Sequence, residues 1–375
     1  MNSAPDHTHP YQVEIIESVE IEQLQHTWVT LQNSIEVPFF LSWHWISCWL
    51  HTYNPKVLLV TASFQDRVVA MGLFTRSTQM RRGFINSRQI LLHQTGDPLE
   101  DQIWMEYNDF MALDEHRINA VNACLKTLEI DLHWDEIVLS MMPATRALEV
   151  ASTNSDAILD QYRPCYAVNL DNIRRTQKQY LDLLTANTRY QISRSLRLYQ
   201  QKHGEVRLQI AESTEQALAF FHSAGPYHIE RWEDSGYLNP QFVKFHQNLI
   251  NDSFQHSAVQ ILKLVSGEKT IAIMYYHIVD KSVYFYLHGL LYDQNKKLKP
   301  GLVAHALATQ YFIDQGMSSY DFMGGYSQYK EQLADLSENL VTVVIQRPRS
   351  RFKLENMARS LKSRIISAND WLQIR

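Results

Sequence analysis

The chain has 375 residues, 45% of them hydrophobic and 20% charged, a composition typical of a folded globular protein long enough for two domains. Its formal net charge of −5 gives no overall basis for binding DNA or RNA. The three cysteines are scattered, which excludes a disulfide framework and fits a cytoplasmic location. The start, MNSAPDHTHPYQVEI, lacks the features of a signal peptide, and no apolar run approaches the ~20 residues that a membrane span needs.

The first half of the chain alternates strand-like and helix-like segments. Ser42 is a favourable N-cap for the segment WHWISCWLHTY, in which Trp45 and Trp49 share one helical face. We interpret that segment as a buried core helix. In chain order, the pattern predicts strand 11–17, helices 20–33 and 43–53, strands 56–63, 68–75, 89–93 and 103–112, helix 114–129, strand 136–141, a helix from residue 143 and strand 165–170.

The second half continues the alternation and repeats part of the first. The hairpin at 261–278 resembles the one at 58–74, and each is later followed by a long helix and a short strand. This repetition predicts tandem α/β domains, each with a mixed sheet. The further predicted elements are helices 177–184 and 187–203, strand 206–211, a helix from Ser213 towards residue 224, a loop over 228–238, helix 240–254, strand 283–290, helix 300–316 and strand 320–323.

Residues 283–330 carry the pattern that points most directly to a ligand. An aromatic β run is followed by a polar loop with three lysines, and Pro300-Gly301 then opens an apolar helix. Proline is tolerated at the first helical position because its missing N–H would be unpaired there. The first turn of this helix offers free N–H groups and the positive end of the helix dipole beside the lysines. The sequence therefore predicts a phosphate or pyrophosphate site at this helix N-terminus.

The order of strand, cationic loop, helix N-terminus and strand resembles the acyl-CoA-binding core of the GNAT acyltransferase superfamily. The ending YDFMGG at 320–325, followed by Tyr329-Lys330, looks like the GNAT-like subgroup associated with bacterial polysaccharide and envelope biosynthesis. That subgroup is related to the Fem-type peptidoglycan aminoacyltransferases. One departure concerns the GNAT pyrophosphate loop, which usually reads Arg/Gln-x-x-Gly-x-Gly/Ala and here keeps only Gly301.

The resemblance implies an α/β fold with mixed sheets, built from two tandem GNAT-like domains at 11–170 and 171–347. A basic amphipathic tail helix would follow at 348–375. A Phe- and Trp-rich helix like 43–53 is found in the resembling family, which favours a role near the substrate as the alternative to core packing. Asp109 matches a family pattern of an acidic residue at the end of a strand.

In the GNAT fold two parallel strands splay apart and pair with the pantetheine arm of the donor. By their order, these strands are 283–290 and 319–323 here, which would place the acyl carbonyl near His288. Lys330 resembles a lysine that in Fem-type relatives helps to hold the donor and to stabilise the transition state. Both residues also have a simpler interpretation, His288 as a hydrogen-bonded core histidine and Lys330 as a surface lysine.

An amine that attacks a thioester must lose a proton, so the site needs a base and donors for the oxyanion. The candidate catalytic residues are Lys330, Asp321, His288 and His228, with Glu230 as a further candidate base. The residues expected to bind CoA are Gly289, Lys299, Pro300, Gly301 and Leu302. The residues expected to bind the substrates are Arg194, Arg197, Glu230, Arg231, Trp232, Tyr237 and Tyr329. For the two arginines on helix 187–203, a solvated helix face is the alternative.

These features predict an N-acyltransferase that moves an acyl group from acyl-CoA, with acetyl-CoA as the expected co-substrate, to an amine such as an amino sugar or an envelope precursor. Two alternatives stay open: a Fem-type enzyme with an aminoacyl-tRNA donor, and a catalytically silent scaffold that binds glycan precursors. Fem-type enzymes usually carry a long coiled-coil arm. This sequence has no recognisable arm of that kind, which argues against an aminoacyl-tRNA donor. No GxSxG, HExxH, Walker A or GxGxxG motif occurs, and the histidines lack a metal-ligand spacing, so we expect neither a metal nor DNA as partner.

The tail from residue 347 changes character, with eight Lys or Arg and two acidic residues. Its apolar residues at 354, 357, 361 and 365 are spaced for one helix face. A basic amphipathic helix can lie on an anionic membrane surface, so peripheral contact with the inner face of the membrane is one expectation. Binding to RNA and packing back onto the domain are the other two.

Overall fold

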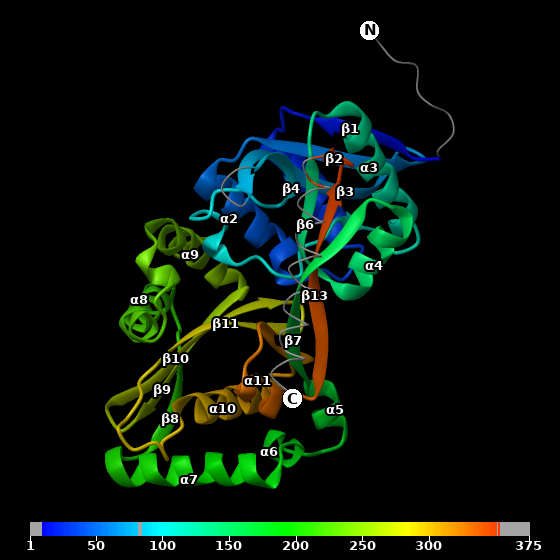
Figure 1. Cartoon of the computed structure of the whole chain (residues 1–375). Helices are drawn as coiled ribbons and strands as arrows, with labels where there is room; N and C mark the ends of the chain where they lie inside the picture. The colour runs from blue at the N-terminus through cyan, green and yellow to red at the C-terminus, as the bar shows by residue number, and fades with distance from the viewer. Residues whose placement is uncertain (1–9, 82–84, 351, 353–375) are drawn as a thin grey trace, which may run out of the picture.

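The computed structural model of the protein describes residues 10–81, 85–350 and 352 (Figure 1). The described strands are β1 Gln12–Ile16, β2 Val57–Phe64, β3 Arg67–Arg81, β4 Ile85–Leu92, β5 Met111–Ala112, β6 Glu136–Pro143, β7 Ala157–Asn169, β8 Val206–Ile210, β9 Val259–Ser266, β10 Lys269–Val279, β11 Ser282–Leu290, β12 Ser319–Gly324 and β13 Leu336–Gln346. The described helices are α1 Ile21–Gln32, α2 Trp43–Tyr53, α3 Arg117–Asp131, α4 Ala144–Thr153, α5 Leu170–Arg175, α6 Tyr180–Leu183, α7 Ala186–His203, α8 Thr214–Arg231, α9 Pro240–Ser253, α10 Pro300–Asp314 and α11 Gln328–Leu333. The α/β class expected from the sequence is confirmed.

The described strands form one mixed sheet in the order β1-β2-β3-β4-β6-β13-β7-β12-β11-β10-β9-β8, and β5 pairs with β3 beside this path. In this sheet β4 pairs with β6 in parallel, and so does β11 with β12. Each half of the chain therefore combines one parallel pair with an antiparallel hairpin, β2–β3 in the first half and β9–β10 in the second. The repetition agrees with the duplication that the sequence indicates.

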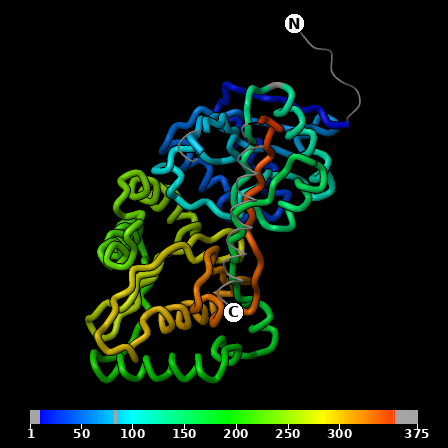
Figure 2. The backbone as a smooth tube through the Cα atoms, in the orientation of Figure 1, coloured from blue at the N-terminus to red at the C-terminus, as the bar shows by residue number. Residues whose placement is uncertain are grey.

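The long strands β7 and β13 join the two halves. β13 pairs with β6 along residues 340–346 and with β7 along residues 336–345. β7 in turn pairs with β12 through residues 165–169. Figure 2 shows these two strands, green and orange, running side by side from one half to the other. The domain limits predicted at residues 170 and 347 thus fall beside a shared pair of strands, and the last strand of the second half lies against the first.

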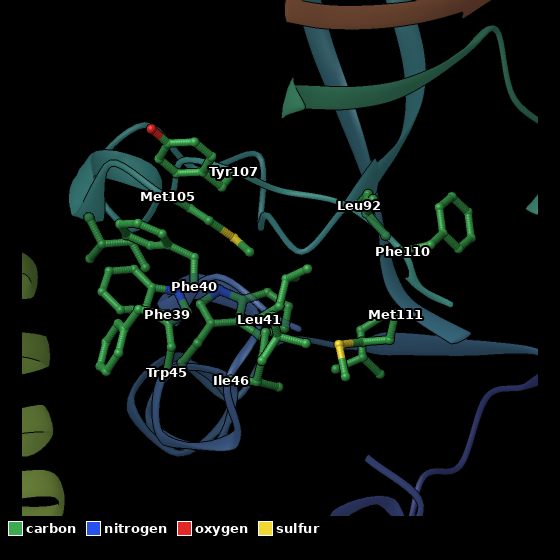
Figure 3. Close-up of a cluster of buried hydrophobic side chains, with 14 of the residues drawn as sticks. Phe39, Phe40, Leu41, Trp45, Ile46, Leu92, Met105, Tyr107, Phe110 and Met111 are labelled. Atoms are coloured by element: carbon green, nitrogen blue, oxygen red, sulfur yellow. The ribbon is translucent and has the colours of Figure 1, made fainter. Parts of the chain in front are cut away.

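Aromatic side chains around the start of α2 belong to a buried cluster of the first half (Figure 3), and they also contact the second half. Phe39, Phe40 and Trp45 are fully buried. The Phe39 ring stacks on His277 of β10 with ring centres 4.4 Å apart, and Trp45 packs edge-on against Phe245 of α9 at 4.8 Å. Burying one such side chain typically contributes ~1.5–3 kcal/mol. The Trp-rich segment is therefore a core helix that also holds the two halves together.

The strand expected over 103–112 is mostly irregular chain. Only Met111–Ala112 forms a strand, and a short 3-10 turn covers Asp101–Ile103. The φ angles of Trp104 and Tyr107 are 47° and 51°, in the left-handed region that a β-strand does not accommodate. This loop brings side chains of the first half towards the second half.

The helix after Ser213 is longer than the sequence indicates. α8 continues through Pro226 and ends at Arg231, so His228 and Arg231 extend from a helix and not from the predicted loop. Proline disfavours the helical conformation in the residue before it and removes one N–H donor, which explains the early end that the pattern predicted. Here the surrounding packing outweighs that local preference.

The start of the basic tail packs against the first half. The Arg347 guanidinium lies 4.4 Å from the ring centre of Trp134, and Arg349 Nε lies 2.8 Å from the Asp135 carboxylate. The tail helix predicted at 348–375 falls almost entirely outside the described residues, so contact with a membrane through it stays a prediction. Among the helices that the structure describes, none has the length and apolar character to cross a membrane.

Candidate active site

The parallel strands β11 and β12 diverge after a short stretch of pairing. Within the described chain they pair through residues 282–284 and 319–321 and no further. The register of β11 against β10 shifts at Tyr286, and that of β12 against β7 shifts between Asp321 and Gly324, so each strand is irregular where the two separate. The splay expected for these strands is confirmed. Their facing edges keep backbone N–H and C=O groups that pair with no strand there.

A cavity of about 740 Å³ opens at this fork. Its walls come from β11, the loop into α10, the first turn of α10, the end of β12, α11 and the C-terminal end of α8. Trp104, Glu106 and Arg163 of the first half close one end. A cavity of this size, lined by eight aromatic and eight charged residues, has the apolar surface and the polar groups of a small-molecule site. The predicted site residues that line it are His228, Arg231, Trp232, His288, Lys299, Pro300, Gly301, Leu302, Tyr329 and Lys330.

The N-terminus of α10 forms the cationic end of the cavity. Pro300 is the first helical residue, and the next two backbone N–H groups have no acceptor within the helix. The Lys299 N–H donates to Ser195 Oγ of α7 at 2.9 Å, which fixes the start of the helix. A Cβ atom added at Gly301 would lie 3.2 Å from the Leu290 side chain, so the glycine lets Leu290 pack close to the first turn of the helix. Free N–H groups, the helix dipole and neighbouring lysines make this end suitable for a phosphate group.

Lys330 and Glu106 converge on the peptide groups around Gly324. Lys330 Nζ donates to Met323 O at 3.2 Å and to Gly324 O at 2.8 Å, and Glu106 Oε2 accepts the Gly324 N–H at 2.6 Å. A Cβ atom on Gly324 would lie only 2.8 Å from Glu106 Oε1, so this approach requires glycine. Burial raises the pKa of Glu106 and lowers the pKa of Lys330, while the charge of each group opposes the shift of the other. An ammonium group and a carboxylate are thus held together at the first-half end of the cavity.

Asp321 lies behind this pair and does not line the cavity. Its carboxylate accepts hydrogen bonds from the Tyr107 hydroxyl at 2.6 Å and from the Met323 N–H at 2.5 Å. Burial raises the pKa of Asp321 to about 7, and the two hydrogen bonds oppose that shift. The position suits a residue that supports the turn carrying Gly324.

Replacing Asp321 by Asn should make the protein less sensitive to pH. The folded pKa of about 7 lies above the unfolded value of 3.8, so the stability that Asp321 contributes is present at low pH and is lost as the pH rises towards 7. One such group changes the free energy of unfolding by at most about 1.4 kcal/mol per pH unit. Urea unfolding at pH 5 and pH 8 measures this effect. Between pH 5 and pH 8 the free energy of unfolding of the wild type should therefore fall relative to that of Asp321→Asn. Parallel behaviour of the two proteins would contradict the raised pKa.

The two candidate histidines line the cavity but are weak bases. Burial lowers the pKa of His288 to about 3 and that of His228 to about 4. His288 Nδ1 is buried with no hydrogen-bond partner among the described residues. His228 Nδ1 lies 2.8 Å from Ser235 Oγ, which fixes its ring at the end of α8. Both imidazoles are neutral at pH 7, where they can accept or donate a hydrogen bond but hold a proton poorly.

The remaining predicted site residues lie outside the cavity lining. Gly289 has its missing Cβ directed at α8, where an added atom would lie 2.6 Å from Ala224 O, so this glycine serves helix packing. Tyr237 donates its hydroxyl hydrogen to Phe221 O of α8 at 2.9 Å, so it holds the following turn against that helix. Glu230 is exposed on α8, and Arg194 and Arg197 belong to α7 on the far side of α10 from β11.

Several residues that line the cavity were not among the site residues predicted from the sequence. Glu106 is the most informative, because it lies three residues before Asp109, which the sequence pattern favoured. Asp109 instead forms a buried ion pair with Arg117 of α3, inside the first half. The alternation of a strand would have placed Glu106 and Asn108 on one face, but nothing in that pattern links either residue to the second half. The lining residues without a prediction include Trp104, Glu106, Arg163, Asp234, Tyr292 and Tyr326.

Comparison with known proteins agrees with this geometry. Residues 186–331 match the family described as "Acetyltransferase (GNAT) domain". The fold is similar to the crystal structure of FemX, with a TM-score of 0.58 and 10% sequence identity over 91% of this chain and 99% of that one. It is also similar to L-PGS from Bacillus licheniformis, with a TM-score of 0.52 and 8% identity over 90% of this chain and 96% of that one.

A third similar structure is a tandem GNAT protein from the clavulanic acid biosynthesis pathway, with a TM-score of 0.50 and 7% identity over 90% of this chain and all (100%) of that one. The sequence matches no curated protein. At these identities the structural likeness establishes the fold, and the family match covers the segment that carries the cavity. Residues 186–331 thus resemble the GNAT domain family, and the whole chain has a fold similar to those of FemX and the tandem GNAT protein.

Proposed function

We propose that the protein is an N-acyltransferase that moves an acyl group from a CoA thioester to an amine. The observation that carries this proposal is the cavity at the fork of β11 and β12. It joins a helix N-terminus suited to phosphate with a Lys330–Glu106 pair suited to charge stabilisation and proton transfer. The family match of residues 186–331 supports the same reaction class.

The donor would lie along the fork. Its diphosphate fits the N-terminus of α10, where Lys296 and Lys299 add positive charge. The amide groups of pantetheine would pair with the free backbone edges of β11 and β12, as an added strand does. The thioester then reaches the end of the cavity formed by Gly324, Glu106 and Lys330.

The reaction needs one bond made and one broken. The amine nitrogen attacks the thioester carbonyl, the C–N bond forms, and the C–S bond breaks to release the thiolate of CoA. Glu106, whose pKa is raised by burial, accepts the proton that the amine loses. Lys330, oriented by two carbonyl groups, stabilises the negative charge that develops on the carbonyl oxygen and then on sulfur. The proton bound to Glu106 can return to the thiolate.

The acceptor and the class of acyl donor define the substrates of the proposed reaction. An amino sugar or another envelope-related amine is the acceptor that the sequence resemblance favours. The longest described helices, α7 and α8, have 18 residues each, and none of the described helices forms the long coiled-coil arm of an aminoacyl-tRNA-dependent enzyme. We therefore keep acyl-CoA as the donor, with aminoacyl-tRNA and a silent glycan-binding scaffold as the competing possibilities.

A ligand screen followed by an assay tests the function. Acetyl-CoA, longer acyl-CoAs and free CoA should each raise the Tm, and release of the free thiol should depend on an added amine. If only charged tRNA stabilises the protein, aminoacyl-tRNA and not acyl-CoA is the acyl donor. Binding of glycan precursors without thiol release would support the scaffold.

Replacing Gly301 by Val should weaken CoA binding by about 10-fold, equivalent to ~1.4 kcal/mol. Gly301 and Leu290 both line the cavity, and a Cβ atom at 301 would already lie 3.2 Å from Leu290, so a valine would crowd the lining beside the N–H groups and weaken their contact with the diphosphate. Isothermal titration with CoA measures the change. Gly301→Ala is the graded control, because the flexible Leu290 side chain can yield to one methyl group. A folded Gly301→Val protein with unchanged CoA affinity would remove this helix from the donor site.

A further inference from the structure

A group of exposed aromatic and cationic side chains lies at the rim of the cavity. Trp232, after the end of α8, is 46% exposed, and Tyr292, in the loop between β11 and α10, is 57% exposed. Both side chains line the cavity. The Arg231 guanidinium lies 5.5 Å from the Trp232 ring centre and 5.9 Å from the Tyr292 ring centre, so it bridges the two rings. We call these three residues the rim platform.

The two segments that carry the rim platform are already ordered by hydrogen bonds. The Trp232 N–H donates to His228 O at 3.0 Å, which continues the pattern of α8. In the loop, the Asp293 carboxylate accepts the Asn295 N–H at 2.9 Å and pairs with Lys202 of α7 at 2.5 Å. A surface whose backbone segments are already ordered loses less conformational entropy when a flat ligand stacks on it.

The chemistry around the rim platform distinguishes the ligands that could stack there. Large aromatic rings left exposed at a cavity rim mark a binding surface. Indole, phenol and guanidinium groups stack on nucleobases and also on sugar rings. Lys296 and Lys299 line the same cavity, at the α10 N-terminus that suits a phosphate. A base joined to phosphates uses both features, whereas a neutral sugar would leave the lysines and the helix end unused.

We propose that the rim platform stacks the purine ring of an adenosine nucleotide whose phosphates bind at the N-terminus of α10. This inference rests on the donor site of the proposed function and names the part of the donor that the rim platform recognises. The same adenosine group ends CoA and forms the 3′ terminus of tRNA. Adenosine recognition therefore does not depend on which of the two carries the acyl group.

Binding measurements with fragments of the donor test this proposal. The probes are CoA, 3′,5′-ADP, 4′-phosphopantetheine and a short RNA that ends in CCA. In the double variant Trp232→Ala/Tyr292→Ala, affinity for the adenosine-containing probes that the wild type binds should fall about 5- to 100-fold, the effect of losing base stacking. Affinity for 4′-phosphopantetheine should stay unchanged, and Trp232→Phe/Tyr292→Phe should keep most of the adenosine affinity. Tyr162→Ala, an equally exposed tyrosine (62%) outside the cavity lining, is the control for losing a surface ring.

The outcomes separate the rim platform from the proposed function. If the double variant binds CoA and 3′,5′-ADP as the wild type does, or if the wild type binds neither 3′,5′-ADP nor the RNA, the purine site is wrong. If the wild type binds the RNA and not CoA, and the double variant loses that binding, the rim platform stands and the CoA donor is replaced by tRNA. If CoA and 3′,5′-ADP bind through the rim platform but no amine is acylated, the site stands and the transferase proposal fails.

Discussion

Lys330→Ala should lower kcat by about 10²-fold or more while KM for the acyl donor stays nearly the same. Lys330 Nζ is fixed by the carbonyl oxygens of Met323 and Gly324, with the carboxylate of Glu106 nearby. In the ground state the thioester oxygen carries little charge, so the ammonium group contributes little to donor binding. As the amine adds, that oxygen becomes negative, and the interaction strengthens only then. Steady-state kinetics with the best amine acceptor separates the two constants.

Controls must separate this effect from a loss of structure. Removing Lys330 leaves two carbonyl groups and Glu106 without their cation, so the Tm of the variant has to be compared with the wild type. Lys126→Ala, an exposed lysine on α3 in the first half, is the matched control and should keep full activity. Full turnover by a folded Lys330→Ala protein would show that Lys330 does not stabilise the transition state, despite the likeness of Tyr329-Lys330 to Fem-type relatives. The positive charge would then have to come from another lining residue such as Arg163.

The second-half part of the site could be predicted because its signals are local. A run of β-forming residues, a lysine-rich loop and Pro300-Gly301 each act over a few residues, and together they place β11, α10 and the cationic end of the cavity. The divergence of β11 and β12 was implied by the GNAT resemblance, and the order of elements identified the two strands. By contrast, the sequence did not indicate that Gly289 packs its Cβ-less face against α8, because the periodicity of a strand does not show which face a helix will cover. That glycine meets α8 and not the cavity.

The first-half part of the site depends on contacts between distant segments. Glu106 accepts the N–H of Gly324, a residue more than two hundred positions away, and it does so from a loop with left-handed residues on either side. Arg163 reaches the cavity from β7, which pairs with β12 only because β7 and β13 run between the halves. Local propensity contains no information on such pairings. The predicted acidic residue, Asp109, was therefore three positions from the one that lines the cavity.

The repeated topology allows the ends of the two parallel strand pairs to be compared. β4 and β6 are the first-half counterparts of β11 and β12, and they too pair in parallel over a short stretch. Leu92, Met105 and Phe110 are buried around the end of β4, as the cluster in Figure 3 illustrates. At the start of α3, Arg117 pairs with Asp109 and so neutralises the end that corresponds to the cationic start of α10. The first half contributes packing and the lining residues Trp104, Glu106 and Arg163, and the second half contributes the fork.

Glu106→Gln should lower kcat/KM by about 10²-fold or more, within the range that general base catalysis usually contributes. Glutamine can still accept the Gly324 N–H through its side-chain oxygen, so the turn should keep its shape, while the group that takes the proton is lost. Burial raises the pKa of Glu106, so the wild-type rate should fall as the pH drops through that raised pKa and the base becomes protonated. The variant should lose this acid limb and stay slow at every pH.

A pH series of kcat/KM for wild type and variant measures both effects at once. Glu331→Gln is the matched control, because Glu331 follows Lys330 directly, is exposed and lies outside the cavity lining. It should keep the rate and the acid limb of the wild type. A Glu106→Gln protein with an unchanged rate and profile would show that the amine gives up its proton elsewhere. His228 is then the next group to replace, although burial lowers its pKa to about 4, which puts its acid limb below the raised pKa of Glu106.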